Sequence, residues 1–190
     1  MNYEKSKTIT PQQQRSIKSK KRILDSAKKI FAEKGLHGGR IDQIANLSNV
    51  NKQRIYAYFG SKMQLYREVL KSIYSRISEN KALANLKEKD IPNLTSLIID
   101  AFFDFHERNP LFWRLLSWEN LNGGKSLRPS DWEHIQAGYI QKIRQLYKTG
   151  QKKGTFRSDI DFSTYIITLF AATYFYHSNQ LTISNLLNLK

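Results

Sequence analysis

The chain has 190 residues, of which 40% are hydrophobic and 12% aromatic, which is enough for a packed core and excludes a wholly disordered protein. It contains no cysteine, which excludes disulfide frameworks and cysteine zinc sites and fits a reducing, cytoplasmic compartment. The polar N-terminus lacks the apolar segment of a secretory signal. The longest apolar run, residues 165–176, is shorter than the ~18 residues that a membrane span requires.

The formal net charge of +15 is concentrated toward the N-terminus. Residues 1–62 carry 14 Lys/Arg against 4 Asp/Glu, whereas the remaining 128 residues carry 17 against 12. A basic balance alone fits RNA, DNA, an anionic membrane or simple solubility. The excess positive charge lies at the same end of the chain as residues 41–62, which are described below as a candidate helix-turn-helix, and this position favours DNA.

The first elements are an arm and a helix. Residues 1–17 are polar and lack apolar periodicity, so we expect a flexible basic arm. From Ile23 to Phe31 apolar residues recur at spacings of three and four, which predicts an amphipathic helix. Gly35 is placed to end this helix as a left-handed cap.

Residues 41–62 predict two short helices separated by a polar turn. Asn51 is a good N-cap for the second of them, and Gly60 breaks it. Two short helices in this order are what a helix-turn-helix needs to place one helix in the major groove of DNA. The predicted core of this unit comprises Ile30, Phe31, Ile41, Ile44, Ala45, Val50, Ile55 and Phe59.

The rest of the chain predicts further helices and no strand. Their expected extents are 62 to about 80 from a Ser61/Gln64 capping box, Pro92 to Asn109, Pro110 to about Asn120, a long helix from Ser130 to Gly150, and Asp161 to about Gln180, with a polar connector at 81–90. The fold class is therefore all-α. We expect a three-helix DNA-binding domain at 18–62 and a larger helical domain for ligand binding and dimerisation at 63–190.

The N-terminal residues resemble the TetR family of bacterial transcriptional regulators over roughly residues 20–66. The matching segments are Arg22-Ile23-Leu24 with Ala27 and Phe31, Gly35, Ile44-Ala45, Val50, Ile55-Tyr56-Ala57-Tyr58-Phe59, Ser61-Lys62 and Leu65. Weaker similarity extends to Asn109-Pro110, Arg114-Leu115-Leu116 with Glu119-Asn120, and Gly154-Thr155-Phe156-Arg157 with Asp161.

The resemblance implies a homodimer that binds a double-stranded DNA operator and whose body binds a small molecule that changes the spacing of the two DNA-binding heads. Carried over by position, Tyr56 and Lys62 match the family's phosphate contacts, and Lys52, Gln53 and Arg54 occupy the base-reading start of the recognition helix. Arg40 and Tyr58 complete the expected DNA-binding set. The basic arm, with Lys5, Lys7, Arg15 and Lys18, either enters the minor groove or attracts DNA diffusely.

Three features depart from the family pattern. Arg40 replaces the usual N-cap threonine, so the second helix is capped otherwise or frays, and Asn49 replaces a turn glycine, which asparagine tolerates. The third departure is that this sequence ends at Lys190, soon after its apolar helix, whereas many relatives have a further long helix that completes the dimer interface. We expect either that Ile183 to Leu189 supplies a short version or that the interface is built differently.

The C-terminal body is rich in aromatic residues, most of which we assign to its core. The candidate ligand-binding residues are Phe105, Trp113, Trp118, Glu119, Tyr139 and Tyr174. His106, Glu119 and His134 are candidate polar contacts, although a surface or capping role is the commoner one for such residues. A buried Glu119 would indicate a cationic ligand.

The most consistent function is a ligand-responsive transcriptional regulator, a repressor released from a near-palindromic operator. The alternatives are a non-specific architectural nucleic-acid-binding protein, a helical enzyme or carrier for an apolar molecule, and an activator with the same head. The four histidines (His37, His106, His134, His177) show no metal-ligand spacing, and no nucleophile motif or glycine-rich phosphate loop is present. We therefore expect no catalytic site, metal or cofactor.

Overall fold

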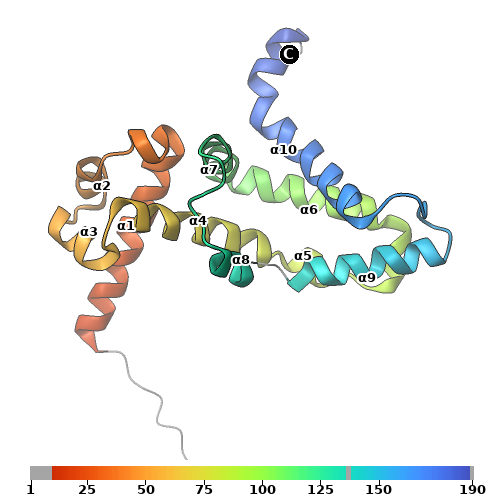
Figure 1. Ribbon diagram of the computed structural model, residues 1–190, viewed down its shortest axis with the longest axis horizontal. Coiled ribbons are helices and arrows are strands. Elements are labelled where there is room, and N and C mark those ends of the chain that lie inside the picture. The colour runs from red at the N-terminus through yellow and green to blue at the C-terminus, as the bar shows by residue number, and fades with distance from the viewer. Residues whose placement is uncertain (1–9, 136–137, 189–190) are drawn as a thin grey trace, which may run out of the picture. The chain divides into compact units, whose positions relative to one another are not determined.

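The computed structural model describes residues 10–135 and 138–188, and every regular element in these ranges is a helix (Figure 1). The elements are α1 Pro11–Gly38, α2 Ile41–Ser48, α3 Lys52–Phe59, α4 Lys62–Ser78, α5 Lys81–Ala84, the 3-10 helix η1 Glu88–Asn93, α6 Leu94–Arg108, α7 Pro110–Leu121, α8 Pro129–Ile135, α9 Gly138–Lys152 and α10 Phe162–Leu186. They form two compact units, one up to Val69 and one from Leu70 onward. The predicted all-α fold class is confirmed.

Helix α1 begins earlier than expected. The Thr10 side chain accepts a hydrogen bond from the Gln13 N–H, the Gln13 side chain accepts one from the Thr10 N–H, and Pro11 fixes the first helical φ. Residues 11–17 are therefore helical, and the prediction of a flexible arm was wrong for them. The helix could not be recognised from apolar periodicity because these residues are mostly polar. Residues 1–9, the rest of the expected arm, lie outside the described residues.

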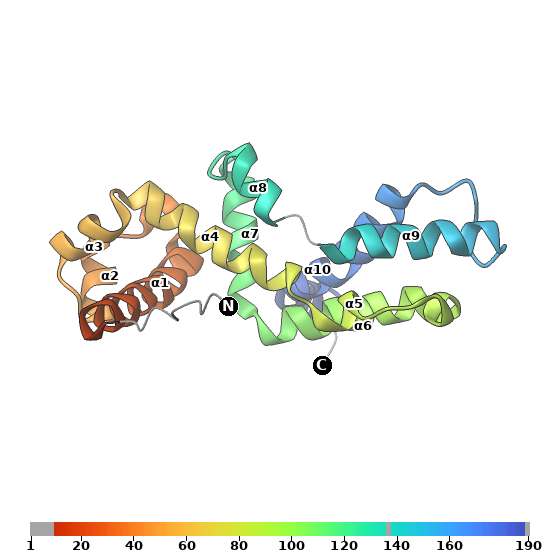
Figure 2. The same ribbon diagram turned by 90° about the horizontal axis from the view of Figure 1, so that it is seen from below.

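The N-terminal unit, here called the head, contains α1, α2, α3 and the first turns of α4 (Figures 1 and 2). Gly35 interrupts α1 with φ 66°, in agreement with the predicted cap position. Ile44, Ile55 and Phe31 are buried in the core of the head, as predicted. Phe31 also packs edge-on against Tyr66, with ring centroids 5.1 Å apart, so α4 contributes a core residue that the sequence analysis did not identify.

In the C-terminal unit, here called the body, α6 packs against α10 and α7, while α9 packs against α5 and η1. Its main core joins residues of α5, η1, α6, α9 and α10: Leu83, Leu86, Ile91, Leu94, Ile98, Ala101, Phe102, Tyr139, Ile143, Leu146, Tyr147, Phe162 and Leu169. The expected polar connector at 81–90 therefore contains buried leucines within α5 and after it.

The expected long helix from Ser130 corresponds to α8 and α9, with residues 136–137 between them outside the described residues. Helix α8 starts at Pro129, and the Asp131 carboxylate accepts a hydrogen bond from the Arg128 N–H at 2.9 Å, so Ser130 lies within the first turn. Ile135 and Tyr139 are buried, whereas Trp132 is 37% exposed.

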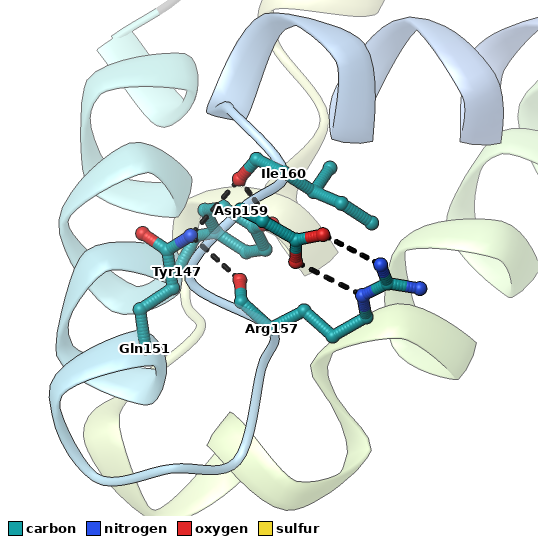
Figure 3. Close-up of polar contacts among 5 residues, drawn as sticks. All are labelled: Tyr147, Gln151, Arg157, Asp159 and Ile160. Carbon is teal, nitrogen blue, oxygen red and sulfur yellow. Dashed lines mark hydrogen bonds and ion pairs between the residues drawn. The ribbon is translucent and has the colours of Figure 1, made fainter.

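A tight connection joins α9 to α10 (Figure 3). The Gln151 side-chain amide donates hydrogen bonds to the carbonyl oxygens of Arg157 and Ile160, and the Tyr147 hydroxyl donates to the Ile160 carbonyl at 3.0 Å. A Cβ at Gly150 would lie 2.3 Å from the Phe156 ring, so only glycine allows this close approach. The connection therefore fixes where α10 begins.

Helix α10 begins at the predicted cap, because the Asp161 carboxylate accepts hydrogen bonds from the Ser163 and Thr164 N–H groups. It continues beyond the expected end near Gln180, and residues 183–186 form its last turn and not a separate segment. Among the described residues, no helix is both long and apolar enough to cross a bilayer.

Candidate functional site

The turn between α2 and α3 has a defined backbone. Asn49 adopts the left-handed conformation (φ 51°, ψ 46°) that its position predicted, and the Val50 N–H donates to the Ala45 carbonyl at 3.1 Å. The Asn51 side chain accepts a hydrogen bond from the Arg54 N–H at 2.8 Å and so caps α3, as predicted. These bonds fix the direction of α3 relative to α2 within the head.

Helix α3 presents a polar outer face. Ile55 is 1% exposed and Phe59 is half-buried, so these two residues mark the inward side. At about 100° per residue, Ala57 lies at the centre of the outward side with Gln53 and Arg54 next to it, and all three are exposed. A small residue between Gln and Arg allows a close approach to base edges, where Gln pairs with adenine and Arg with guanine.

The two tyrosines lie on opposite edges of this face. Tyr56 is 46% exposed and shares its edge with Lys52, one turn earlier. Tyr58 is half-buried on the other edge, where the Lys20 ammonium lies 5.4 Å from its ring centroid. Because the edges of a helix in the major groove face opposite walls, the two tyrosines are placed for the backbones of different strands.

Two of the expected DNA-binding lysines already have partners. Lys52 forms an ion pair with Asp42 of α2, and both side chains are more than half exposed. Such an exposed pair contributes at most about 1 kcal/mol, so a phosphate or base can replace Asp42. The Lys62 ammonium donates to the His37 carbonyl at 3.2 Å and so links the start of α4 to the end of α1.

The remaining predicted residue, Arg40, is exposed at the N-cap position of α2 and provides no side-chain cap, as its replacement of threonine suggested. The structural bond of Lys62 could not be predicted from the sequence, because its partner is a backbone carbonyl 25 residues away.

The body contains a histidine enclosed by aromatic rings. His106 is 1% exposed, and its ring centroid lies 5.3–6.3 Å from the centroids of five neighbouring rings: Phe105 at 5.7 Å, Phe112 at 5.7 Å, Phe170 at 5.5 Å, Tyr174 at 6.3 Å and His177 at 5.3 Å. Neither ring nitrogen has a hydrogen-bond partner among the residues that the structure describes. Burial, together with the neighbouring His177, lowers the pKa of His106 to about 4. The imidazole is therefore neutral near pH 7.

Glu119 is also buried, at 2% exposure. One carboxylate oxygen accepts a hydrogen bond from the Ser126 N–H at 2.7 Å, and the other has no partner within the described part of the chain. Burial and the charge of Glu119 raise the pKa of Tyr74. The expected surface or capping role was therefore wrong for both residues: rings of α10 enclose His106, and Glu119 is buried beside Ser126, which follows α7 in the chain. The side chain of His134 lies outside the described residues.

The structure brings together only part of the predicted ligand set. Phe105 and Tyr174 both belong to the group around His106, and the Tyr174 hydroxyl lies 2.7 Å from the Ser117 hydroxyl. Trp113 and Trp118 are half-buried, whereas Tyr139 belongs to the main core of the body. Three residues of this group, Phe170, Tyr174 and His177, share one face of α10 at spacings of four and three, a signal that could have identified His177 from the sequence.

Comparison with known proteins agrees with both units. Residues 23–69 match the family of bacterial regulatory proteins, tetR family, and residues 93–190 match the tetracyclin repressor-like C-terminal domain. The chain is 34% identical over 175 residues to the HTH-type transcriptional repressor NicS of Pseudomonas putida, covering 92% of this chain and 82% of that protein. It is also 34% identical over 136 residues to the HTH-type transcriptional repressor SCO4008 of Streptomyces coelicolor, covering 72% of this chain and 66% of that protein.

Solved structures share the fold at lower identity. A TetR family transcription regulator from Marinobacter aquaeolei superposes with a TM-score of 0.71 at 14% identity, covering 90% of this chain and 87% of that one. The putative transcriptional regulator SCO4942 from Streptomyces coelicolor has a TM-score of 0.67 at 24% identity, with 88% and 84% covered. The chain belongs to the TetR family of bacterial transcriptional regulators.

Proposed function

We propose that the protein acts as a homodimer on a near-palindromic operator and releases it when a small molecule binds the body. The observation that carries this proposal is the outer face of α3, where Gln53, Arg54 and Ala57 are exposed on a helix held by a capped turn. Two such helices enter successive major grooves about one helical turn, ~34 Å, apart. Tyr56, Lys62 and Arg40 then contact phosphates.

The exposed side chains of helix α10 support the proposal of a dimer. Large apolar side chains are exposed along it: Ile167 65%, Phe175 55%, Tyr176 53%, Leu181 77% and Leu186 77%. Its C-terminal half extends beyond the elements that pack on its first half (Figure 1). A helix that is apolar all round is normally buried, and a second copy of the chain would bury this one.

The group around His106 and the buried Glu119 support an effector site in the body. A neutral imidazole offers one donor and one acceptor, and each buried polar group without a partner costs about 1–3 kcal/mol. An effector that bonds to these groups would recover this cost. The unpaired oxygen of Glu119 favours a group that donates a hydrogen bond or carries positive charge.

Effector binding needs only a small differential free energy to release DNA. A ligand that binds one arrangement of the two heads more tightly shifts the population toward it, and a coupling of about 1–3 kcal/mol changes operator affinity 5- to 150-fold. The names of NicS and SCO4008 support repression as the result of operator binding.

The proposal is tested by selecting duplexes from a random library with the full-length protein and sequencing them. We expect an inverted repeat whose half-site centres lie about 10 base pairs apart, or a multiple of that. A population of bound duplexes without sequence preference would overturn the proposal and support the non-specific architectural alternative.

A further inference from the structure

A groove of about 930 Å³ lies within the head between the first turns of α1 and the recognition helix α3. We call it the α1–α3 groove. The residues of its wall that matter for its chemistry are Gln12, Arg15, Ser16 and Ser19 from α1, and Arg54 and Tyr58 from α3.

Helical spacing explains why these residues meet. Positions 12, 15, 16 and 19 recur at intervals of three and four, so they share one face of α1, and Arg54 and Tyr58 are one turn apart on α3. The small side chains of Ser16 and Ser19 leave space between the helices. Lys20, the next residue of α1, places its ammonium 5.4 Å from the Tyr58 ring and connects the two walls.

The groove is built for an anion. Arg15 and Arg54 are exposed side chains on opposite walls, and Gln12, Ser16 and Tyr58 add amide and hydroxyl donors. Within the described residues, the groove wall contains no carboxylate. Arginine with nearby hydroxyl donors is the combination that proteins use for phosphate oxygens.

We propose that the α1–α3 groove binds the phosphodiester backbone of one operator strand, with Arg15 as its main phosphate contact. This inference rests on the proposed function, because Arg54 of the same groove then faces the bases. The strand concerned is the one on the Tyr58 edge of α3, opposite the Tyr56 edge. The eight residues from Gln12 to Ser19 span about 10 Å along the axis of α1.

The capped start of α1 makes this contact different from that of a flexible arm. The Thr10–Gln13 capping box begins the helix five residues before Arg15, so the backbone of the contact is ordered before DNA binds. Binding then loses less conformational entropy than the ordering of a disordered segment would. The groove therefore adds a fixed wall of contacts beside the recognition helix.

The test compares Arg15→Gln with wild type in a salt titration, using a duplex that the wild-type protein has selected. Each lost phosphate contact reduces the slope of log K against log[salt] by about 0.9, so a dimer should lose about 1.8 in slope and on the order of tenfold in affinity at 0.15 M salt. Ethylation interference should show one phosphate per half-site losing its effect. Lys29→Gln is the matched control, since Lys29 is exposed on the same helix, about 21 Å away.

A second variant separates DNA contact from folding. Gln12→Glu adds a negative charge in the first turn of α1, where acidic residues stabilise a helix, but it places that charge in the groove. We expect an unchanged or higher melting temperature together with weaker DNA binding. A loss of both would mean that the groove is structural.

Equal slopes for Arg15→Gln and wild type, or equal reductions in Arg15→Gln and Lys29→Gln, would overturn the inference while leaving the proposed function intact. If the wild-type protein selects no sequence, the proposed function fails. The same slopes measured on a random 30-base-pair duplex then still decide whether the groove holds the DNA backbone.

Discussion

At the scale of single residues, several side chains that were expected to contact ligands also hold the structure together. Lys62 donates to the His37 carbonyl and Lys52 pairs with Asp42, so both link neighbouring helices of the head. His106 is enclosed without a partner for its ring nitrogens among the described residues. Variants at these positions therefore need measurements of stability as well as of binding.

Tyr56→Phe and Lys62→Met should both weaken DNA binding on every sequence, because each removes a proposed phosphate contact. Only Lys62→Met should also reduce the salt dependence, because only the lysine carries a charge that releases counterions from DNA. Only Lys62→Met should also lower the melting temperature, since only Lys62 makes the bond to His37. A salt titration and a thermal melt of each variant check this. Unchanged affinity in both variants would contradict the assignment of phosphate contacts.

His106 should make the protein less stable as the pH falls from about 6.5 to about 4. Its pKa is about 4 in the folded chain against 6.5 in the unfolded chain, so in this window only the unfolded state takes up the proton. The loss is on the order of 2 kcal/mol. Urea unfolding of His106→Leu at several pH values should show a smaller loss over this window, and an identical pH profile would contradict the assigned burial effect.

At the scale of elements, helix ends were easier to predict than side-chain environments. Asn49 ends α2, and Asn51 and Asp161 begin α3 and α10 as expected, because caps depend on local backbone chemistry. Gly35 interrupts α1, which continues to Gly38. The early start of α1 was not predicted, although Thr10 and Gln13 have the capping-box pattern. The reason is that helices were predicted from the spacing of apolar residues, and residues 11–17 lack that spacing.

The candidate sites show the same limit. The outer face of α3 follows from helical spacing alone, so Gln53 and Arg54 were placed correctly on it. The enclosure of His106 depends on α6, α7 and α10 packing together, which pairs residues far apart in the chain. No local sequence pattern predicts contacts between residues so far apart. The α1–α3 groove was hidden for the same reason.

Asn49→Ala tests the turn between α2 and α3. Its left-handed backbone costs roughly 1–2 kcal/mol for a residue other than Gly or Asn, so the variant should lower the free energy of unfolding by about that amount. Asn49→Gly is the control and should remain within a few tenths of a kcal/mol of wild type, because glycine adopts this conformation freely. Equal destabilisation by both variants would show that the side chain of Asn49 matters, and not its backbone.

At the scale of the whole molecule, function depends on two units with different tasks. The head carries the proposed DNA-reading surface, and the body carries the enclosed polar groups and the exposed apolar side chains of α10. A single head covers only one half-site, so affinity for an operator requires that two copies be joined.

Leu181→Lys should separate the proposed dimer, because Leu181 is 77% exposed on α10 and a lysine there would be buried in the interface. Sedimentation should show a monomer, and affinity for the selected duplex should fall by at least tenfold, while helical content is unchanged. Lys148→Gln, which alters an exposed site on α9, is the control. A Leu181→Lys protein that remains dimeric would exclude this part of α10 from the interface.

The most direct test of the central claim, that the outer face of α3 reads DNA bases, is the base-preference profile of Arg54→Ala compared with wild type in a selection from random duplexes. Arg54 lies on the exposed side of α3, and a bidentate arginine contact to guanine is worth about 1–3 kcal/mol of discrimination. The account predicts that preference is lost at one symmetric position in each half-site while the other positions are retained. An unaltered profile would contradict it.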